Sequence, residues 1–263
     1  MKFLKFSHYI ITYLLALFIF GAIGTVLVKG APILHLAIQN AEIWFAVKLS
    51  LYTSAVSTIL SFIVALPVAY LLARKEIPGH LLVVNILRIP LNLPPIVSGV
   101  SLLLLFGTTP FGRLLEHLGV QVVFSELGII IAQFFINVPG LITVLIAAIE
   151  SVDIRLEYIA RTLGYNPLQA FTKVTLPLIR NGMIAGLILT WGKALGEFGA
   201  VLMLAGATRF KTETLPISLY LHMSTGDIEG LMVIASILIL ISVISMTLFE
   251  NARGKTIKRR HLQ

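Results

Sequence analysis

Two charged residues, Lys193 and Glu197, stand near the middle of an otherwise apolar run, "GMIAGLILTWGKALGEFGAVLMLAG". A lone charge at the centre of a membrane helix costs ~3 kcal/mol on insertion scales, so such a residue usually serves a purpose. Because the two lie four positions apart, their side chains can reach each other on a helix. They predict either a neutralised pair that fixes helix contacts or a polar element of a transport path.

Other side chains that could catalyse a reaction or bind a metal or nucleotide are absent or unsuitably placed. The absence of cysteine excludes thiolate metal sites and cysteine nucleophiles. The six histidines do not pair at metal-ligand spacing, Asp153 and Asp227 lie outside the apolar runs, and Ser98 has no histidine near it. The "GKT" at 254–256 lacks the first glycine of a phosphate-binding loop, since position 249 is Phe249. We therefore expect no catalytic residue, metal site or cofactor in this chain.

The composition points to a membrane. Of the 263 residues 57% are hydrophobic and 12% charged, against roughly 25% charged in an average soluble domain. The net charge of +8 could indicate nucleic acid, but the basic residues lie between apolar runs, as in membrane proteins. We expect the lipid bilayer, and no nucleic acid, as a partner.

Six apolar stretches are long enough to cross a bilayer. In lipid each segment must satisfy its own backbone groups, so the stretches are expected to be helices. The predicted fold is an all-α integral membrane protein with one transmembrane domain over 1–263 and six spans, at about 9–28, 43–73, 84–106, 127–149, 182–205 and 231–249.

The positions of Lys and Arg predict the orientation. With the N-terminus inside, the inner segments hold thirteen of these residues and the outer segments four. Cytoplasmic segments carry the excess of basic residues. Both termini and the segment 151–177 are thus expected in the cytoplasm.

Prolines interrupt three of the predicted spans: Pro67 in the second, Pro90, Pro94 and Pro95 in the third, and the "NVPG" that starts at Asn137 in the fourth. Each removes a backbone donor. Broken helices at membrane depth occur where they line a water-filled cavity, but a kink repaired by neighbouring helices is an equal alternative. The residues proposed for a translocation pathway are Pro94, Pro95, Ser98, Asn137, Lys193 and Glu197.

Small residues in the fifth span predict close helix packing. Gly192, Gly196 and Gly199 fall on one narrow face at helical spacing. Such a face lets another helix approach.

The segment "LEYIARTLGYNPLQAFTKVTLPLIRNG" is charged and broken, and still reads as helical. A short helix is expected from Arg155 to Leu163, with Gly164 in the left-handed conformation after it. Asn166 can cap a second helix, with Pro167 in its first position, and Gln169 can complete a capping box. That helix is expected to run to about Val174 and to end before Pro177. Packing under the protein's own helices and docking into a partner remain equal alternatives.

This segment resembles the cytoplasmic loop of ABC importer permeases, E-A-A-x-x-x-G followed after nine residues by I-x-L-P. Here Gly164 is followed after nine residues by Val174-Thr175-Leu176-Pro177. The first three positions of the motif depart from the pattern. Tyr158, Ile159 and Ala160 replace E-A-A, and Glu157 stands one position earlier.

The resemblance implies a type I importer fold and a coupling helix that inserts into an ATPase subunit. The implied partners are two ATPase subunits, which bind ATP and Mg, a second copy of this permease as a homodimer, and an extracytoplasmic binding protein. It implies the inner membrane of a prokaryote. The implied coupling residues are Glu157, Tyr158, Ala160, Arg161, Gly164, Asn166, Pro167 and Pro177.

The substrate class also follows from a resemblance. "KALGEFGAVLMLAG" and the "KTETLPISLYLHMSTGDIEG" that follows are similar to molybdate and tungstate permeases, and sulfate permeases share "GEFGA". An oxyanion importer is expected, with a sulfate or thiosulfate permease as the alternative. A secondary transporter, a channel or a membrane enzyme is a less supported alternative.

Overall fold

The computed structural model describes residues 2–35, 37, 40–74 and 77–260. All regular structure within these ranges is helical, which confirms the expected fold class. The helices of the first half are α1 (Lys2–Gly30), η1 (Ala31–Ile33), α3 (Ala41–Arg74), α4 (His80–Asn92), α5 (Pro95–Gly107), α6 (Pro110–His117) and α7 (Glu126–Glu150). Those of the second half are α8 (Arg155–Thr162), α9 (Pro167–Ala170), η2 (Phe171–Thr175), α10 (Leu176–Leu178), α11 (Arg180–Leu195), α12 (Gly199–Ala205), α13 (Leu215–Thr225) and α14 (Ile228–Arg260).

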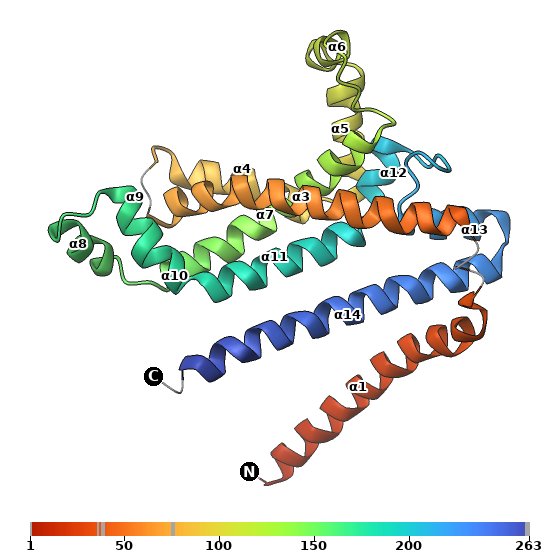
Figure 1. Cartoon of the computed structure of the whole chain (residues 1–263), viewed down its shortest axis with the longest axis horizontal. Coiled ribbons are helices and arrows are strands. Elements are labelled where there is room, and N and C mark those ends of the chain that lie inside the picture. The colour runs from red at the N-terminus through yellow and green to blue at the C-terminus, as the bar shows by residue number, and fades with distance from the viewer. Residues whose placement is uncertain (1, 36, 38–39, 75–76, 261–263) are drawn as a thin grey trace.

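Two long helices, α3 and α7, form the centre of the bundle, and α11 packs against both. Figure 1 shows α3 running the length of the molecule, with α8 and α9 at one end and α13 at the other. Both central helices are continuous through their prolines, Pro67 and Pro139. The sequence left a break and a kink repaired by neighbouring helices as equal alternatives here, and the continuous helices agree with the second.

The third span is broken, as its prolines predict. Leu93 and Pro94 are extended, with ψ of 140° and 135°. The axes of α4 and α5 differ by 113° across this break. Because a residue before proline is disfavoured in helical geometry, the consecutive Pro94 and Pro95 account for the bend.

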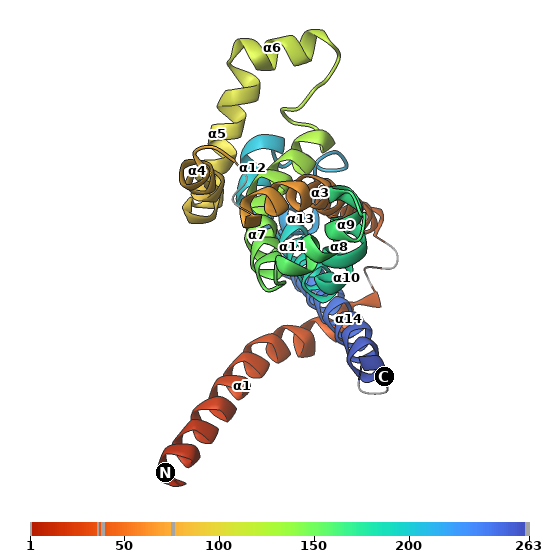
Figure 2. The ribbon, with the colours of Figure 1, turned by 90° about the vertical axis from the view of Figure 1, so that its left-hand side faces the viewer.

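Four helices are long and apolar enough to cross a membrane, and up to six if each of two bent pairs counts as one span. The bent pairs are α4 with α5 and α9–α10 with α11. Helix α1 diverges from the others in Figure 2, and the 18-residue window that marks it as a span is 0% buried. Its last residue, Gly30, lies against Ser236 of α14.

Apolar clusters fill both halves of the bundle. Near α12 the cluster includes Leu102, Ile129 and Leu204, and near α8 it includes Leu145 and Ile149. Hydroxyl side chains of α3 line its buried face instead of large apolar ones: Ser50, Thr53, Ser54, Ser57, Thr58 and Ser61. Small residues of this kind let membrane helices approach closely.

The glycines that permit close packing differ from those expected. Gly192 has nothing within 4 Å of an added Cβ, and Gly196 has only backbone atoms of its own helix there. Neither glycine packs closely against another helix among the described residues. Gly199 packs against Pro95 and Ile96 of α5, with atoms 3.0–3.2 Å from an added Cβ, as the small-residue pattern anticipated.

The tightest approach in this region is that of Gly99 in α5, where an added Cβ would lie 2.8 Å from Ala200 Cα. We predict that Gly99→Ala lowers the free energy of unfolding by about 1–3 kcal/mol, because overpacking must separate α5 from α12. Thermal denaturation of the purified chain measures this. Gly107→Ala on the same helix is the matched control, since its nearest contact is at 3.7 Å. Equal melting temperatures for the two variants would contradict the prediction.

Candidate functional site

The segment 151–177 forms a knob of short helices at one end of the bundle, on the left of Figure 1. Helix α8 ends at Thr162, and Gly164 has φ of 94°. Asn166 Oδ1 accepts from the amide of Gln169 at 2.8 Å, and Gln169 Oε1 accepts from the amide of Asn166 at 2.9 Å. The left-handed glycine and the capping box expected from the sequence are confirmed.

The second short helix does not end near Val174, before Pro177, where the sequence placed its end. Helix α9 continues as the π-helix η2 and then as α10, which includes Pro177 near its start. The proline is tolerated there because the first positions of a helix do not need its missing amide hydrogen. The break falls at Ile179, where the chain bends by 73° into α11.

Glu157 is buried inside the knob, 5% exposed. Its carboxylate accepts hydrogen bonds from the Tyr70 hydroxyl at 2.7 Å and the Thr175 hydroxyl at 2.6 Å. The guanidinium of Arg74 donates to the same carboxylate and forms an ion pair with it. Glu157 therefore joins three elements: α8, the end of α3 and η2.

The surroundings of Glu157 also set its protonation. Burial raises the pKa of its carboxyl, and the hydrogen bonds from Thr175, Tyr70 and Arg74 together outweigh burial and leave the pKa below its ordinary value. A group with a depressed pKa stabilises the fold above its ordinary pKa, about 4.3 for glutamate, and loses that contribution as pH falls. Glu157 is therefore ionised at neutral pH.

The other expected coupling residues divide into an inner and an outer set. Ala160 is buried like Glu157. The exposed set is Tyr158, Arg161, Gly164, Asn166, Pro167 and Pro177. Exposed apolar side chains accompany them, including Ile159 at 56%, Leu163 at 76% and Leu168 at 70%. The exposed surface of the knob is thus formed without Glu157.

Lys193 and Glu197 do not form the ion pair that their spacing allowed; the ion pairs within the described ranges involve other residues. The reason is that α11 ends at Leu195, so the two residues are not on one continuous helix. Glu197 instead accepts a hydrogen bond at 3.1 Å from the amide of Ala200, in the first turn of α12. A carboxylate at this position satisfies a free amide at the start of a helix.

Lys193 is exposed and lines a cleft of about 600 Å³ between α11 and α14. Gly192, Ser242 and Ser245 also line it. The other proposed path residues are not gathered there. Pro94 and Pro95 lie exposed at the start of α5, whereas Ser98 and Asn137 are buried inside the chain.

Sequence reasoning missed Gln133 of α7, which is 1% exposed. Its side-chain amide donates to the carbonyl of Ala194 at 2.9 Å, within the last turn of α11. This bond satisfies one carbonyl beside the break in the helix. A buried glutamine in an apolar span was the available signal, since intramembrane polar groups need a partner. Arg74 and Tyr70 were missed as partners of Glu157 because they lie more than eighty positions before it.

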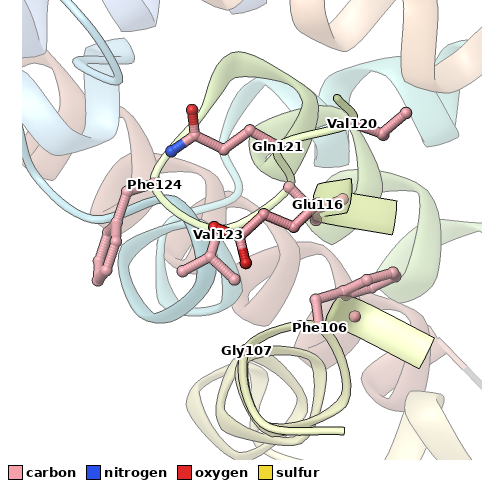
Figure 3. Close-up of a pocket in the computed structure, with 9 residues that line it drawn as sticks. Phe106, Gly107, Glu116, Val120, Gln121, Val123 and Phe124 are labelled. Atoms are coloured by element: carbon pink, nitrogen blue, oxygen red, sulfur yellow. The ribbon is translucent and has the colours of Figure 1, made fainter. Parts of the chain in front are cut away.

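A smaller pocket of about 250 Å³ lies beside α6 (Figure 3). It is lined by Phe106, Gly107, Gly112, Glu116, Val120, Gln121, Val122, Val123 and Phe124. Glu116 is the one charged side chain of this lining. An acidic group among apolar ones does not suit an anionic ligand, so we do not assign the transport path to this pocket.

A membrane bundle with a broken span and a knob of short helices at one end is the architecture expected of a permease. Residues 65–258 match the family described as binding-protein-dependent transport system inner membrane component, and the chain belongs to this family. It is a type I ABC importer permease, and therefore a multi-pass protein of the prokaryotic inner membrane.

Several curated relatives are similar over most of their length. The molybdenum transport system permease protein ModB of Mycobacterium tuberculosis is 36% identical over 76% of this chain and 75% of that protein. ModB of Escherichia coli is 35% identical over 79% and 92%. The sulfate transport system permease protein CysW of Synechocystis is 32% identical over 87% and 83%.

Solved structures share the fold. A bacterial ABC transporter involved in the import of the acidic polysaccharide alginate has a TM-score of 0.76 at 18% identity, covering 98% of this chain and 96% of that chain. The MetNI methionine ABC transporter in an inward-facing conformation has a TM-score of 0.59 at 20% identity, covering 79% and 92%. These structures confirm the type I importer fold.

We predict that Glu157→Gln loosens the knob by about 3 kcal/mol, because removing one charge leaves Arg74 buried without its ion-pair partner. Amide hydrogen exchange in α8 and η2 should become faster. Glu150→Gln, which changes an exposed carboxylate at the end of α7, is the matched control. Identical exchange in the two variants would show that the ion pair does not hold the knob.

Proposed function

We propose that this chain is the membrane subunit of an ATP-driven importer for an oxyanion, molybdate or tungstate. The proposal is supported by two molybdenum permeases, from Mycobacterium tuberculosis and Escherichia coli, that are 35–36% identical over three quarters or more of this chain. In the working complex two copies of the chain assemble with two ATPase subunits and an extracytoplasmic binding protein. One of the structural neighbours is an alginate transporter in complex with a periplasmic protein, which supports a binding-protein partner.

The proposed mechanism is alternating access. ATP binding draws the two ATPase subunits together, each knob moves with its ATPase, and the cavity between the two permeases opens outward. Within this chain the buried carboxylate of Glu157 connects α8 to Arg74 and Tyr70. Movement of the knob is therefore passed directly to α3, a spanning helix. ATP and Mg bind to the ATPase, and this chain acts as the translocation subunit.

In the proposed orientation the knob and both termini face the cytoplasm, as the distribution of basic residues predicts. The surface that meets the ATPase is the exposed set around α8, with Tyr158 and Arg161 beside apolar Leu163. Exposed leucine, isoleucine and tyrosine side chains on a charged segment suit docking into an apolar groove. Glu157 and Ala160 support this surface from inside.

Leu163→Glu tests the docking surface. We expect about tenfold weaker association with the ATPase or more, because a charge is placed where an apolar contact is buried. Leu118→Glu is the matched control: each leucine directly follows an eight-residue helix and precedes a left-handed glycine, and the two are 76% and 69% exposed. Co-purification of the permease with its ATPase measures the effect. Equal loss in both variants would place the contact elsewhere.

The transport path is proposed to follow the exposed face of α11. Gly192 and Lys193 line the cleft between α11 and α14 there, and Gly196 is exposed just after the helix. A lysine gives an anion a positive charge without the bidentate geometry of arginine, which suits passage more than tight binding. Pro94, Pro95, Ser98 and Asn137 are proposed to shape and brace the path from the broken third span and α7.

A sulfate or thiosulfate permease is the second candidate, favoured by the 32% identity to the sulfate permease of Synechocystis over 87% of this chain. An ATP-independent secondary transporter is a weaker candidate, because it has no need of a partner-docking knob.

Uptake into vesicles decides between these candidates. The vesicles contain the permease, its ATPase and its binding protein, and molybdate, tungstate and sulfate compete. We expect ATP-dependent uptake that molybdate or tungstate suppresses more strongly than sulfate does. Vesicles with Lys193→Met should assemble normally and transport more slowly. Preferential uptake of sulfate would overturn the substrate but keep the mechanism, whereas uptake without ATP would overturn the mechanism.

A further inference from the structure

A buried carboxylate lies at the end of the bundle opposite the knob, in a place that the transport mechanism does not use. Glu213 is 0% exposed. It belongs to the loop over 206–214, which joins α12 to α13 at the right of Figure 1. An isolated buried carboxylate is costly, so its partners determine its charge.

The loop is fastened to the first turns of α3 at several points. Arg209 Nη1 donates to Glu42 Oε2 at 3.3 Å. The Phe210 ring lies 5.7 Å from that of Phe45. Just after the loop, the amide of Leu215 donates to the Ser50 hydroxyl at 2.7 Å. The position of the loop is thus defined by α3.

Two carboxyls are neighbours within this contact, those of Glu213 and Glu42. Each carboxyl accepts a hydrogen bond from another group through one of its two oxygens. Glu213 Oε2 accepts from the amide of Phe210 at 3.2 Å, and Glu42 Oε2 accepts from Arg209. The remaining oxygen of each, Oε1, is buried and has no hydrogen-bond donor among the described residues.

A hydrogen between the two carboxyls accounts for both free oxygens. Two carboxylates in direct contact cannot both be ionised, and one of them can donate only if it is protonated. The charge balance agrees: Arg209 offsets one of the two negative charges, and one proton offsets the other. We propose that Glu213 and Glu42 share one proton, and that this proton locks the loop over 206–214 onto α3.

The other charged groups nearby do not replace the proton. Helix α13 places the hydroxyl of Ser218 beside Glu213, and its histidine, His222, bonds to the carbonyl of Ser218 and faces Asp227 instead. Lys211 in the loop is exposed, and α12 carries no charged residue. Arg209, at 47% side-chain exposure, is largely in water.

The direction of the pH effect follows from Glu213. Burial raises the pKa of its carboxyl, the neighbouring Glu42 raises it further, and the nearby Ser218 hydroxyl and the amide of Phe210 oppose them without cancelling them. A group with a raised pKa binds its proton more tightly in the locked state. Its contribution is fully present below the ordinary glutamate pKa, about 4.3, and is lost as pH rises through the raised value. The lock is therefore stronger in acid and opens toward alkaline pH.

In the orientation proposed above, this end faces the extracytoplasmic side. The proton then comes from the compartment that holds the binding protein, and the loop is released as that compartment becomes alkaline. The lock itself depends only on the contacts between the loop and α3.

The absence of cysteine from the chain allows a direct test. Thr212 is 0% exposed in the closed loop, so Thr212→Cys reacts with a thiol reagent only when the loop leaves α3. Lys211→Cys, at the exposed neighbouring position, is the matched control and corrects for the thiolate fraction at each pH. Both variants are studied in the purified complex of permease, ATPase and binding protein.

We expect the labelling rate at 212, divided by that at 211, to rise about threefold or more between about pH 5 and about pH 8. Adding Glu213→Gln should make this ratio low and independent of pH, because the amide donates to Glu42 as the protonated carboxyl does. Glu229→Gln, an exposed carboxylate at the start of α14, should leave the pH dependence unchanged.

Unchanged pH dependence in the presence of Glu213→Gln would overturn the proposal. So would calcium that suppresses labelling at high pH, since the pair would then hold a metal ion in place of a proton. Where Thr212→Cys does not fold, amide hydrogen exchange of the loop in the unmodified chain and in Glu213→Gln gives the same comparison.

Discussion

The carboxylate of Glu157 receives hydrogen bonds from α3 and from η2 while its own backbone belongs to α8. The arrangement of the knob depends on this one group, because helices of eight residues or fewer are marginal on their own. A buried ion pair with all its oxygens in use holds such helices in one orientation, and it is weakened sharply when one partner is removed. The exposed residues of the knob can then vary while the hydrogen bonds to Glu157 are kept. Tyr158 and Ile159, which are exposed and differ from the family pattern, are accommodated in this way.

Local signals predicted the local structure well. The capping box at Asn166 and Gln169, the left-handed Gly164 and the break at Pro94 and Pro95 each depend on residues within a few positions, and the structure has all three. For the prolines of α3 and α7 the sequence left a break and a repaired kink as equal alternatives, and both helices are continuous. Neighbouring helices decide whether a proline interrupts a helix. The partners of Glu157 and the bond from Gln133 to α11 join distant segments, and a single sequence contains no information about which distant segments meet.

The same distinction explains Lys193 and Glu197. Their spacing predicted a pair only if the helix continued, and the end of α11 at Leu195 removes that condition. The two residues therefore have different environments. Lys193 lines the cleft beside α14, and Glu197 accepts a hydrogen bond from the first turn of α12. Gln133 bonds to the last turn of α11, so polar groups are present on both sides of this discontinuity. A broken helix in a membrane is stable only with such support.

The small hydroxyl residues of α3 form two kinds of hydrogen bond. Several of them bond to carbonyls of their own helix, as Ser54 and Ser57 do. Two others bond to neighbouring elements: Ser50 accepts from the amide of Leu215 at 2.7 Å, and Thr53 accepts from the side chain of Gln133 at 3.4 Å. A helix of 34 residues is about 50 Å long. The helix is attached near both ends, to Glu157 through Tyr70 and Arg74 and to the loop over 206–214 through Glu42. By thermodynamic reciprocity, any coupling between these two attachments through α3 acts equally in both directions.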